Sequence, residues 1–207
     1  MLPKIQYITQ NDSNSSHYEQ AIKMYEAGCK WVQLRMKDET KETILNEALK
    51  IATYAQKNQV ILTINDHVDI TQASGANGVH LGKNDSDIKL AIKHFSTQKI
   101  IGATANTFAD IKNALNKGAD YIGLGPYRYT STKKILSPVL GLGGYERIIN
   151  KLPTLKKNIP IYAIGGIKMK DMEQLKNIGV YGIAVSGMLL NSTQKETDIK
   201  EIHRIFV

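Results

Sequence analysis

Eight short apolar runs, rich in β-branched and aromatic residues, recur at a steady interval along this chain. They begin at Ile5, Trp31, Val60, Gly78, Lys99, Tyr121, Ile159 and Gly182. Segments with helical spacing of apolar residues, such as residues 18–28 and 41–58, lie between them. Most of the runs are apolar almost throughout, as expected of strands that are covered on both faces. Eight strands alternating with helices in 207 residues predict an α/β fold, a single (β/α)₈ TIM barrel over residues 1–207.

A weaker repeat supports the barrel. A glycine followed by a small residue precedes each of the even-numbered strands, at Gly28, Gly75, Gly118 and Gly179. Glycine suits the position just past a helix C-terminus, where the backbone turns left-handed. A doubly wound parallel sheet is the main alternative, but such a sheet usually has fewer strands and a switch point.

The composition excludes several classes of partner. The chain has 27 Lys and Arg against 19 Asp and Glu, a net charge of +8. Because the lysines are spread along helical segments, they indicate solvated helix faces and no nucleic-acid surface. No apolar run is long enough for a membrane span, and the first ten residues show no secretory signal. The one cysteine, Cys29, fits a buried position in a reducing, cytoplasmic compartment.

In such a barrel, functional side chains lie at the carboxyl ends of the strands. After the seventh and eighth predicted strands these positions hold glycines and a serine, at residues 165–166 and 185–187. Their backbone N–H groups are suited to bind a phosphate at a helix start. The alternative is that the glycines only form tight turns.

Two acids, Asp66 and Asp85, follow the adjacent third and fourth strands. Their carboxylates would converge on Mg²⁺, completed by phosphate oxygens of a substrate, or each would cap the helix that follows it. The cations Arg35, Lys37 and Lys133 favour the metal, because they would complement a diphosphate beside it. A metal and two anion pockets indicate an enzyme that joins two phosphorylated molecules. His80 lies within an apolar strand and is predicted to be a hydrogen-bonded core histidine.

These motifs resemble those of the thiamine phosphate synthase (thiamine-phosphate pyrophosphorylase) family. The resemblance runs through VQLRMK (32–37), INDHVDI (64–70), GANGVHLGKND (75–85), GADYIGLGP (118–126), TSTKK (130–134), IYAIGGI (161–167) and GIAVSG (182–187). It implies an Mg²⁺-dependent transferase with two phosphorylated substrates. The family couples a hydroxymethylpyrimidine diphosphate to a hydroxyethylthiazole phosphate, giving thiamine phosphate and diphosphate by a dissociative, carbocation-like substitution.

The resemblance also implies residue roles. For the pyrimidine diphosphate it implies Gln33, Leu34, Arg35, Met36, Lys37, Asn65, Thr104 and Lys133, with Arg35, Lys37 and Lys133 as the catalytic cations. For the thiazole phosphate it implies Thr130, Ser131, Thr132, Gly166, Val185 and Ser186, and for Mg²⁺ it implies Asp66 and Asp85. The polar segment 127–134 then becomes a predicted lid between two anionic substrates, in which Lys134 has no assigned role. The next helix is expected only after residue 145.

Three positions depart from the family pattern. Tyr129 stands where members commonly have proline, Thr104 where many have serine, and Asn106 where histidine is frequent. These departures bear on substrate contacts and leave the predicted metal carboxylates untouched.

Two other functions are weighed against the synthase. In a thiazole tautomerase of the same superfamily, catalysis is attributed to a histidine after the sixth strand. This chain reads Gly125-Pro126-Tyr127 there, without histidine. A non-catalytic phosphate-ligand sensor would need no paired acids, because it has no leaving group to stabilise. The sequence leaves the oligomeric state open, a homo-oligomer included.

Overall fold

The computed structural model describes residues 1–83, 85–129, 138–155 and 157–206. Eight parallel strands in this part of the chain close into a barrel in sequence order, with the last strand paired to the first. They are β1 (Ile5–Ile8), β2 (Trp31–Leu34), β3 (Ile61–Asn65), β4 (Gly78–Leu81), β5 (Ile100–Ala105), β6 (Tyr121–Leu124), β7 (Ile161–Ile164) and β8 (Gly182–Val185). Each apolar run forms a strand, so the predicted (β/α)₈ barrel is confirmed.

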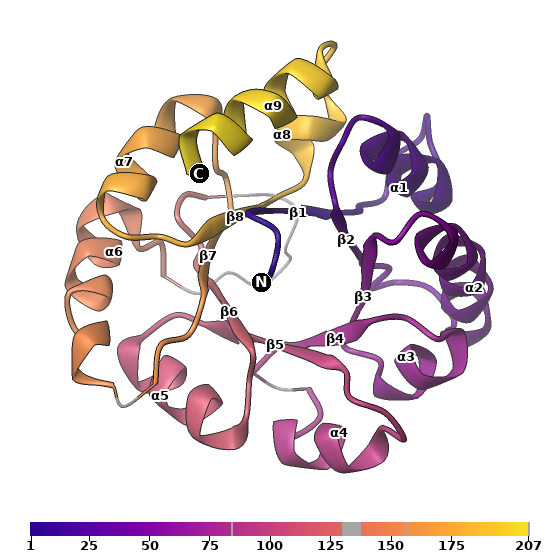
Figure 1. Cartoon of the computed structure of the whole chain (residues 1–207), viewed down its shortest axis with the longest axis horizontal. Helices are drawn as coiled ribbons and strands as arrows, with labels where there is room; N and C mark the ends of the chain where they lie inside the picture. The colour runs from indigo at the N-terminus through magenta and orange to yellow at the C-terminus, as the bar shows by residue number, and fades with distance from the viewer. Residues whose placement is uncertain (84, 130–137, 156, 207) are drawn as a thin grey trace.

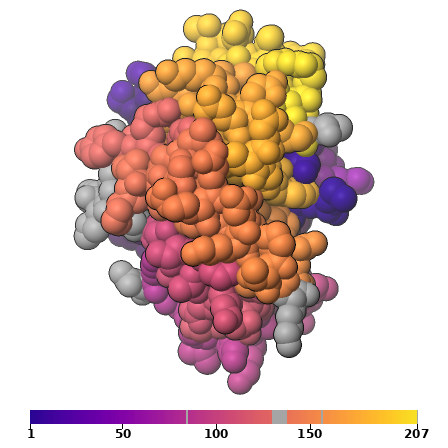
Figure 2. All heavy atoms as spheres, turned by 90° about the vertical axis from the view of Figure 1, so that its left-hand side faces the viewer, coloured from indigo at the N-terminus to yellow at the C-terminus, as the bar shows by residue number. Residues whose placement is uncertain are grey.

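Helices surround the barrel and alternate with its strands (Figure 1). The α-helices are α1 (His17–Glu26), α2 (Lys41–Lys57), α3 (Val68–Ser74), α4 (Ile88–His94), α5 (Phe108–Lys117), α6 (Gly141–Ile149), α7 (Met172–Asn177), α8 (Gly187–Leu190) and α9 (Lys195–Phe206). Two 3₁₀ turns, η1 (Leu152–Thr154) and η2 (Met169–Asp171), complete the described elements. Figure 2 shows the side covered by α5, α6, α7 and α9 as one continuous surface. None of the helices in the described ranges has the length and apolar character needed to cross a membrane.

The predicted glycine repeat is present in the backbone. Gly28, Gly75, Gly118 and Gly179 have φ angles of 99°, 74°, 102° and 91°. Each lies just past the end of a helix, after α1, α3, α5 and α7 respectively. A residue with a Cβ atom is strained in this conformation, whereas glycine adopts it readily. The repeat therefore marks the four junctions that lead from a helix into an even-numbered strand.

Aromatic side chains fill the barrel interior near the amino ends of the strands. Trp31, Tyr121 and Tyr162 are fully buried and pack edge to face, with ring centroids 4.7 to 5.6 Å apart. Such edge-to-face packing is the favoured arrangement of aromatic rings. These rings fill the amino end of the barrel interior.

A second core lies between the barrel and its helices, and Cys29 is part of it. Its thiol is fully buried and lies 3.2 Å from the carbonyl oxygen of Trp31, as predicted for a structural cysteine. One expectation about the helices was wrong, because α6 begins at Gly141, before residue 145. Glycine disfavours helix, yet the N–H groups of Leu140 and Gly141 donate to the carbonyls of residues 126 and 127. These tertiary hydrogen bonds hold the glycine-rich first turn in place.

Candidate active site

A cavity of about 990 Å³ lies at the carboxyl ends of the strands. It is lined by residues that end or follow β1, β2, β5, β6, β7 and β8. Five predicted site residues are among those that line it: Arg35, Thr104, Gly166, Val185 and Ser186. The barrel therefore brings together residues from both predicted substrate regions.

Gln33 and Asn65 lie at the ends of β2 and β3 and contact each other. The Gln33 side-chain amide donates to Asn65 Oδ1 at 2.9 Å. Gln33 is 2% exposed, and its Oε1 atom has no hydrogen-bond partner among the described residues. A buried carbonyl oxygen without a donor is costly, so this atom is suited to accept a hydrogen bond from a ligand. Leu34 and Met36 pack in the outer core, so any contact they make with a ligand comes from their main chain.

Two cations follow β2. Arg35 lines the cavity, and its backbone N–H donates to Thr9 Oγ1 at 3.0 Å. Burial lowers the pKa of Arg35, and the neighbouring carboxylates of Asp66 and Asp38 partly offset this effect. Lys37 Nζ lies 3.2 Å from Asp66 Oδ2. Both cations therefore lie on the side of the barrel that holds the acids.

The carboxyl groups of Asp66 and Asp85 lie close together, as predicted from their positions after adjacent strands. Burial raises the pKa of Asp66 to about 6, and the hydrogen bond and charge of Asp85 add to this, against the opposing effect of Lys37. Burial also tends to raise the pKa of Asp85, but the hydrogen bonds from Asp66 and from the Gly82 N–H lower it overall. The second of these bonds measures 2.6 Å. Just below a pH of about 6 the two carboxyl groups therefore share one proton.

Neither acid caps a helix. The N-cap residue of α3 is His67, which makes no side-chain capping bond. The N-cap of α4 is Asp87, whose carboxylate accepts from the Lys89 N–H at 2.9 Å. The capping alternative is therefore wrong for both Asp66 and Asp85. No cluster of three or more His, Cys, Asp or Glu side chains suited to a metal occurs in the described ranges, so a cation here would have two protein carboxylates and further oxygens from other sources.

His80 connects the barrel interior to the cavity. Its Nδ1 atom lies 3.0 Å from the Tyr121 hydroxyl, and its Nε2 atom lies 3.0 Å from Thr104 Oγ1. The side chain is 5% exposed, so the prediction of a hydrogen-bonded core histidine is confirmed. Through this bond His80 holds the Thr104 hydroxyl at the cavity wall.

The wall formed by the segments after β7 and β8 carries backbone N–H groups. Gly165 and Gly166 follow β7 with φ angles of 92° and 66°. Within the described ranges, the N–H groups of Gly166, Ile167 and Gly187 make no hydrogen bond, and all three residues line the cavity. Ser186 Oγ donates to Gln10 Oε1 at 2.8 Å. Backbone N–H groups after the last two strands are a common means of binding a phosphate in such a barrel.

The chain is similar to known proteins over nearly its whole length. The family model described as thiamine monophosphate synthase matches residues 5–189. The chain is 41% identical over 203 residues to a thiamine-phosphate synthase of Flavobacterium johnsoniae, covering 98% of this chain and 96% of that protein. It is 42% identical over 201 residues to one of Bacteroides fragilis, covering 97% and 98%. The chain belongs to the thiamine monophosphate synthase family.

A solved structure of the same kind supports the assignment to the thiamine monophosphate synthase family. Thiamine phosphate pyrophosphorylase from Pyrococcus furiosus superposes with a TM-score of 0.82 at 26% identity, covering 98% of this chain and 95% of that one. A more distant likeness, to a native KDPGal structure with a TM-score of 0.69 at 16% identity, shows the shared barrel fold alone.

Some predicted family residues lie outside the described ranges. They are Thr130, Ser131, Thr132, Lys133 and Lys134. The described part of the lid segment ends at Tyr129, which lines the cavity and is 72% exposed.

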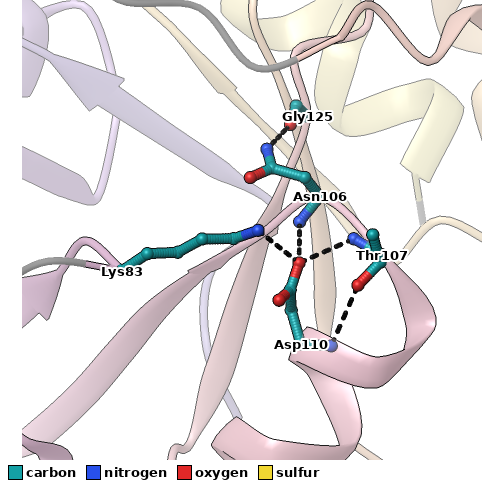
Figure 3. A network of polar contacts seen from close by, with 5 residues as sticks. All are labelled: Lys83, Asn106, Thr107, Asp110 and Gly125. Atoms are coloured by element: carbon teal, nitrogen blue, oxygen red, sulfur yellow. Dashed lines mark hydrogen bonds and ion pairs between the residues drawn. The ribbon is translucent and has the colours of Figure 1, made fainter.

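A polar network that the sequence analysis missed supports the base of this segment (Figure 3). Asp110 Oδ2 accepts from the backbone N–H groups of Asn106 and Thr107, both at 2.9 Å, and lies 2.6 Å from Lys83 Nζ. The Asn106 side-chain amide donates to the carbonyl of Gly125, just past β6. The spacing of Thr107 and Asp110 is that of a capping box, which is the one local signal of this network.

Proposed function

We propose that this member of the thiamine monophosphate synthase family joins a hydroxymethylpyrimidine diphosphate to a hydroxyethylthiazole phosphate, forming thiamine phosphate and diphosphate. The observation that carries the proposal is that one cavity has a cation on one wall and backbone donors on another. Arg35, which lies near Asp66, is on the first wall, and the second carries the N–H groups after β7 and β8 that make no hydrogen bond within the described ranges. Two phosphorylated substrates, each on its own wall, would meet between them.

The acid pair fits a magnesium ion. Asp66 and Asp85 offer carboxylate oxygens, the ligands that Mg²⁺ prefers, and a cation between them would relieve the repulsion that helps to raise the pKa of Asp66. Bound there, Mg²⁺ would supply positive charge to the departing diphosphate.

The residues of the chain would do the remaining work. Gln33 and Asn65 would orient the pyrimidine, while Arg35 and Lys37 would bind the diphosphate oxygens. The bond from the pyrimidine methylene carbon to the diphosphate oxygen breaks, and its electron pair leaves with diphosphate. The lone pair of the thiazole nitrogen then forms the new carbon–nitrogen bond, so no proton has to move. The protein therefore has to position the two substrates and to neutralise the charge of the diphosphate. Lys133 is predicted to add to this neutralisation.

The test is direct. The purified protein is incubated with both substrates, with Mg²⁺ or with a chelator, and thiamine phosphate and diphosphate are measured separately. We expect both products in equal amounts with Mg²⁺ and neither with the chelator. Conversion of a thiazole tautomer without coupling would favour the tautomerase, and binding without any turnover under every metal condition would favour the sensor.

A further inference from the structure

Arg128, four residues past β6, clamps the loop that follows β7. Its backbone N–H donates to the Gly165 carbonyl at 2.9 Å, and its Nη1 atom donates to the Gly166 carbonyl at 2.6 Å. The guanidinium also forms two parallel bonds with Asp171 at the end of η2, of 2.8 and 2.9 Å. Residues 165–168 form this β7 loop. A single arginine therefore contacts this loop at two consecutive carbonyls and at the acid that follows it.

These contacts determine where the loop's donors point. A peptide unit is planar, and its carbonyl and the N–H of the next residue face opposite ways. When Arg128 holds the carbonyls of Gly165 and Gly166, it also sets the directions of the N–H groups of Gly166 and Ile167. In the described part of the chain those two N–H groups have no acceptor, and both residues line the cavity.

The β7 loop has little stiffness of its own. Two consecutive left-handed glycines leave many backbone conformations open, so an external contact has to select one. The fit to Arg128 is close, because a Cβ atom on Gly166 would lie 2.9 Å from Arg128 Cβ.

Asp171 secures the clamp from the other side. One carboxylate oxygen, Oδ2, also accepts from the Lys168 N–H at 2.8 Å, at the far end of the β7 loop. The carboxylate is 5% exposed, so it is shielded from water and less screened than a surface acid. Planar, bidentate pairing of this kind fixes geometry as well as charge.

We propose that Arg128 and Asp171 are positioning residues that aim the Gly166 and Ile167 N–H groups at the phosphate of the thiazole substrate. The inference rests on the function proposed above and makes it specific to one substrate. Losing the clamp should raise the KM for the thiazole phosphate with a much smaller change in kcat. Binding of the pyrimidine diphosphate, on the opposite wall, should stay the same.

The experiment compares Arg128→Met with Arg128→Lys, Asp171→Asn and a control, Arg204→Met. Arg204 also forms two bonds with an acid, Glu201, but on the exposed surface of α9. Calorimetry with each substrate should show about tenfold weaker thiazole phosphate binding for Arg128→Met and Asp171→Asn, partial recovery in Arg128→Lys and no change in the control. The double variant, Arg128→Met with Asp171→Asn, should bind the thiazole phosphate no more weakly than either single variant, because both substitutions remove the same clamp.

A second measurement does not depend on turnover. Inorganic phosphate added to the wild-type protein should shift the amide NMR signals of Gly166 and Ile167, and the shift should shrink in Arg128→Met. If the wild-type protein forms no thiamine phosphate but shows this response, the proposed function fails and the clamp stands. Equal weakening of both substrates, or an unchanged phosphate response in folded Arg128→Met and Asp171→Asn, would overturn the inference.

Discussion

Lowering the pH from about 7 to about 5 should weaken divalent-cation binding at Asp66 and Asp85 about tenfold. The cation requires ionised carboxylates, and the pKa of Asp66 is raised to about 6. About nine tenths of Asp66 is then ionised at the higher pH and about one tenth at the lower.

The stability of the metal-free protein depends on pH through the same pKa. Because the pKa of Asp66 in the folded state exceeds its ordinary value of 3.8, the metal-free protein takes up a proton more readily when folded. The associated stabilisation is complete below the ordinary pKa and is lost as the pH rises through about 6. A bound cation favours the ionised form and should restore stability above that pH.

The assay uses Mn²⁺ as a paramagnetic probe, with free Mn²⁺ measured by electron paramagnetic resonance at each pH. Asp85→Asn should bind Mn²⁺ more weakly at both pH values and show a flatter dependence, since one of the causes that raise the Asp66 pKa is gone. Asp69→Asn, which changes a nearby exposed carboxylate paired with Lys41, is the control and should behave as wild type. A wild-type affinity that does not change with pH, or an Asp85→Asn variant that matches the control, would refute the reasoning.

Two further substitutions test the polar network around the site. Tyr121→Phe removes the hydroxyl that bonds to Gln6 and His80 inside the barrel, so it should cost about 2 kcal/mol and lower Tm by about 4–8 °C. Thermal unfolding measures this, and a Tm equal to that of wild type would contradict it. Lys83→Met removes a half-exposed ion pair to Asp110, so it should cost at most about 1 kcal/mol, and less in high salt. Denaturant unfolding at two salt concentrations measures this, with Lys41→Met as the exposed control. A larger or salt-independent loss of unfolding free energy would show that Lys83 does more than pair with Asp110.

The strands were the most predictable part of the fold. Their residues are mostly apolar and mostly buried, because the barrel interior covers one face of each strand and the helices cover the other. The junction glycines were equally readable, since a left-handed residue after a helix has few alternatives. The start of α6 was not, because Gly141 and Gly143 disfavour helix, and contacts to residues 126 and 127, distant from any local pattern, help to stabilise the turn.

The proximity of Gln33, Asn65 and Asp66 was predictable, because they lie at the carboxyl ends of the adjacent strands β2 and β3. That neither Asp66 nor Asp85 caps a helix was not predictable, because it depends on backbone geometry. Asp66 has a φ of 67° and Asp85 folds back onto the Gly82 N–H, and no residue pattern specifies either. The Arg128–Asp171 clamp joins residues 43 apart in the sequence, with no local signal at either end.

The pairing of β8 with β1 affects how the protein folds during its synthesis. Ser186 reaches Gln10, 176 residues earlier, and the cavity takes walls from both of these regions. A chain growing on the ribosome therefore has no complete cavity until its final strand has emerged and met the first. Substrate binding can stabilise only the finished barrel. A truncated chain that ends before β8 would therefore be inactive rather than partly active.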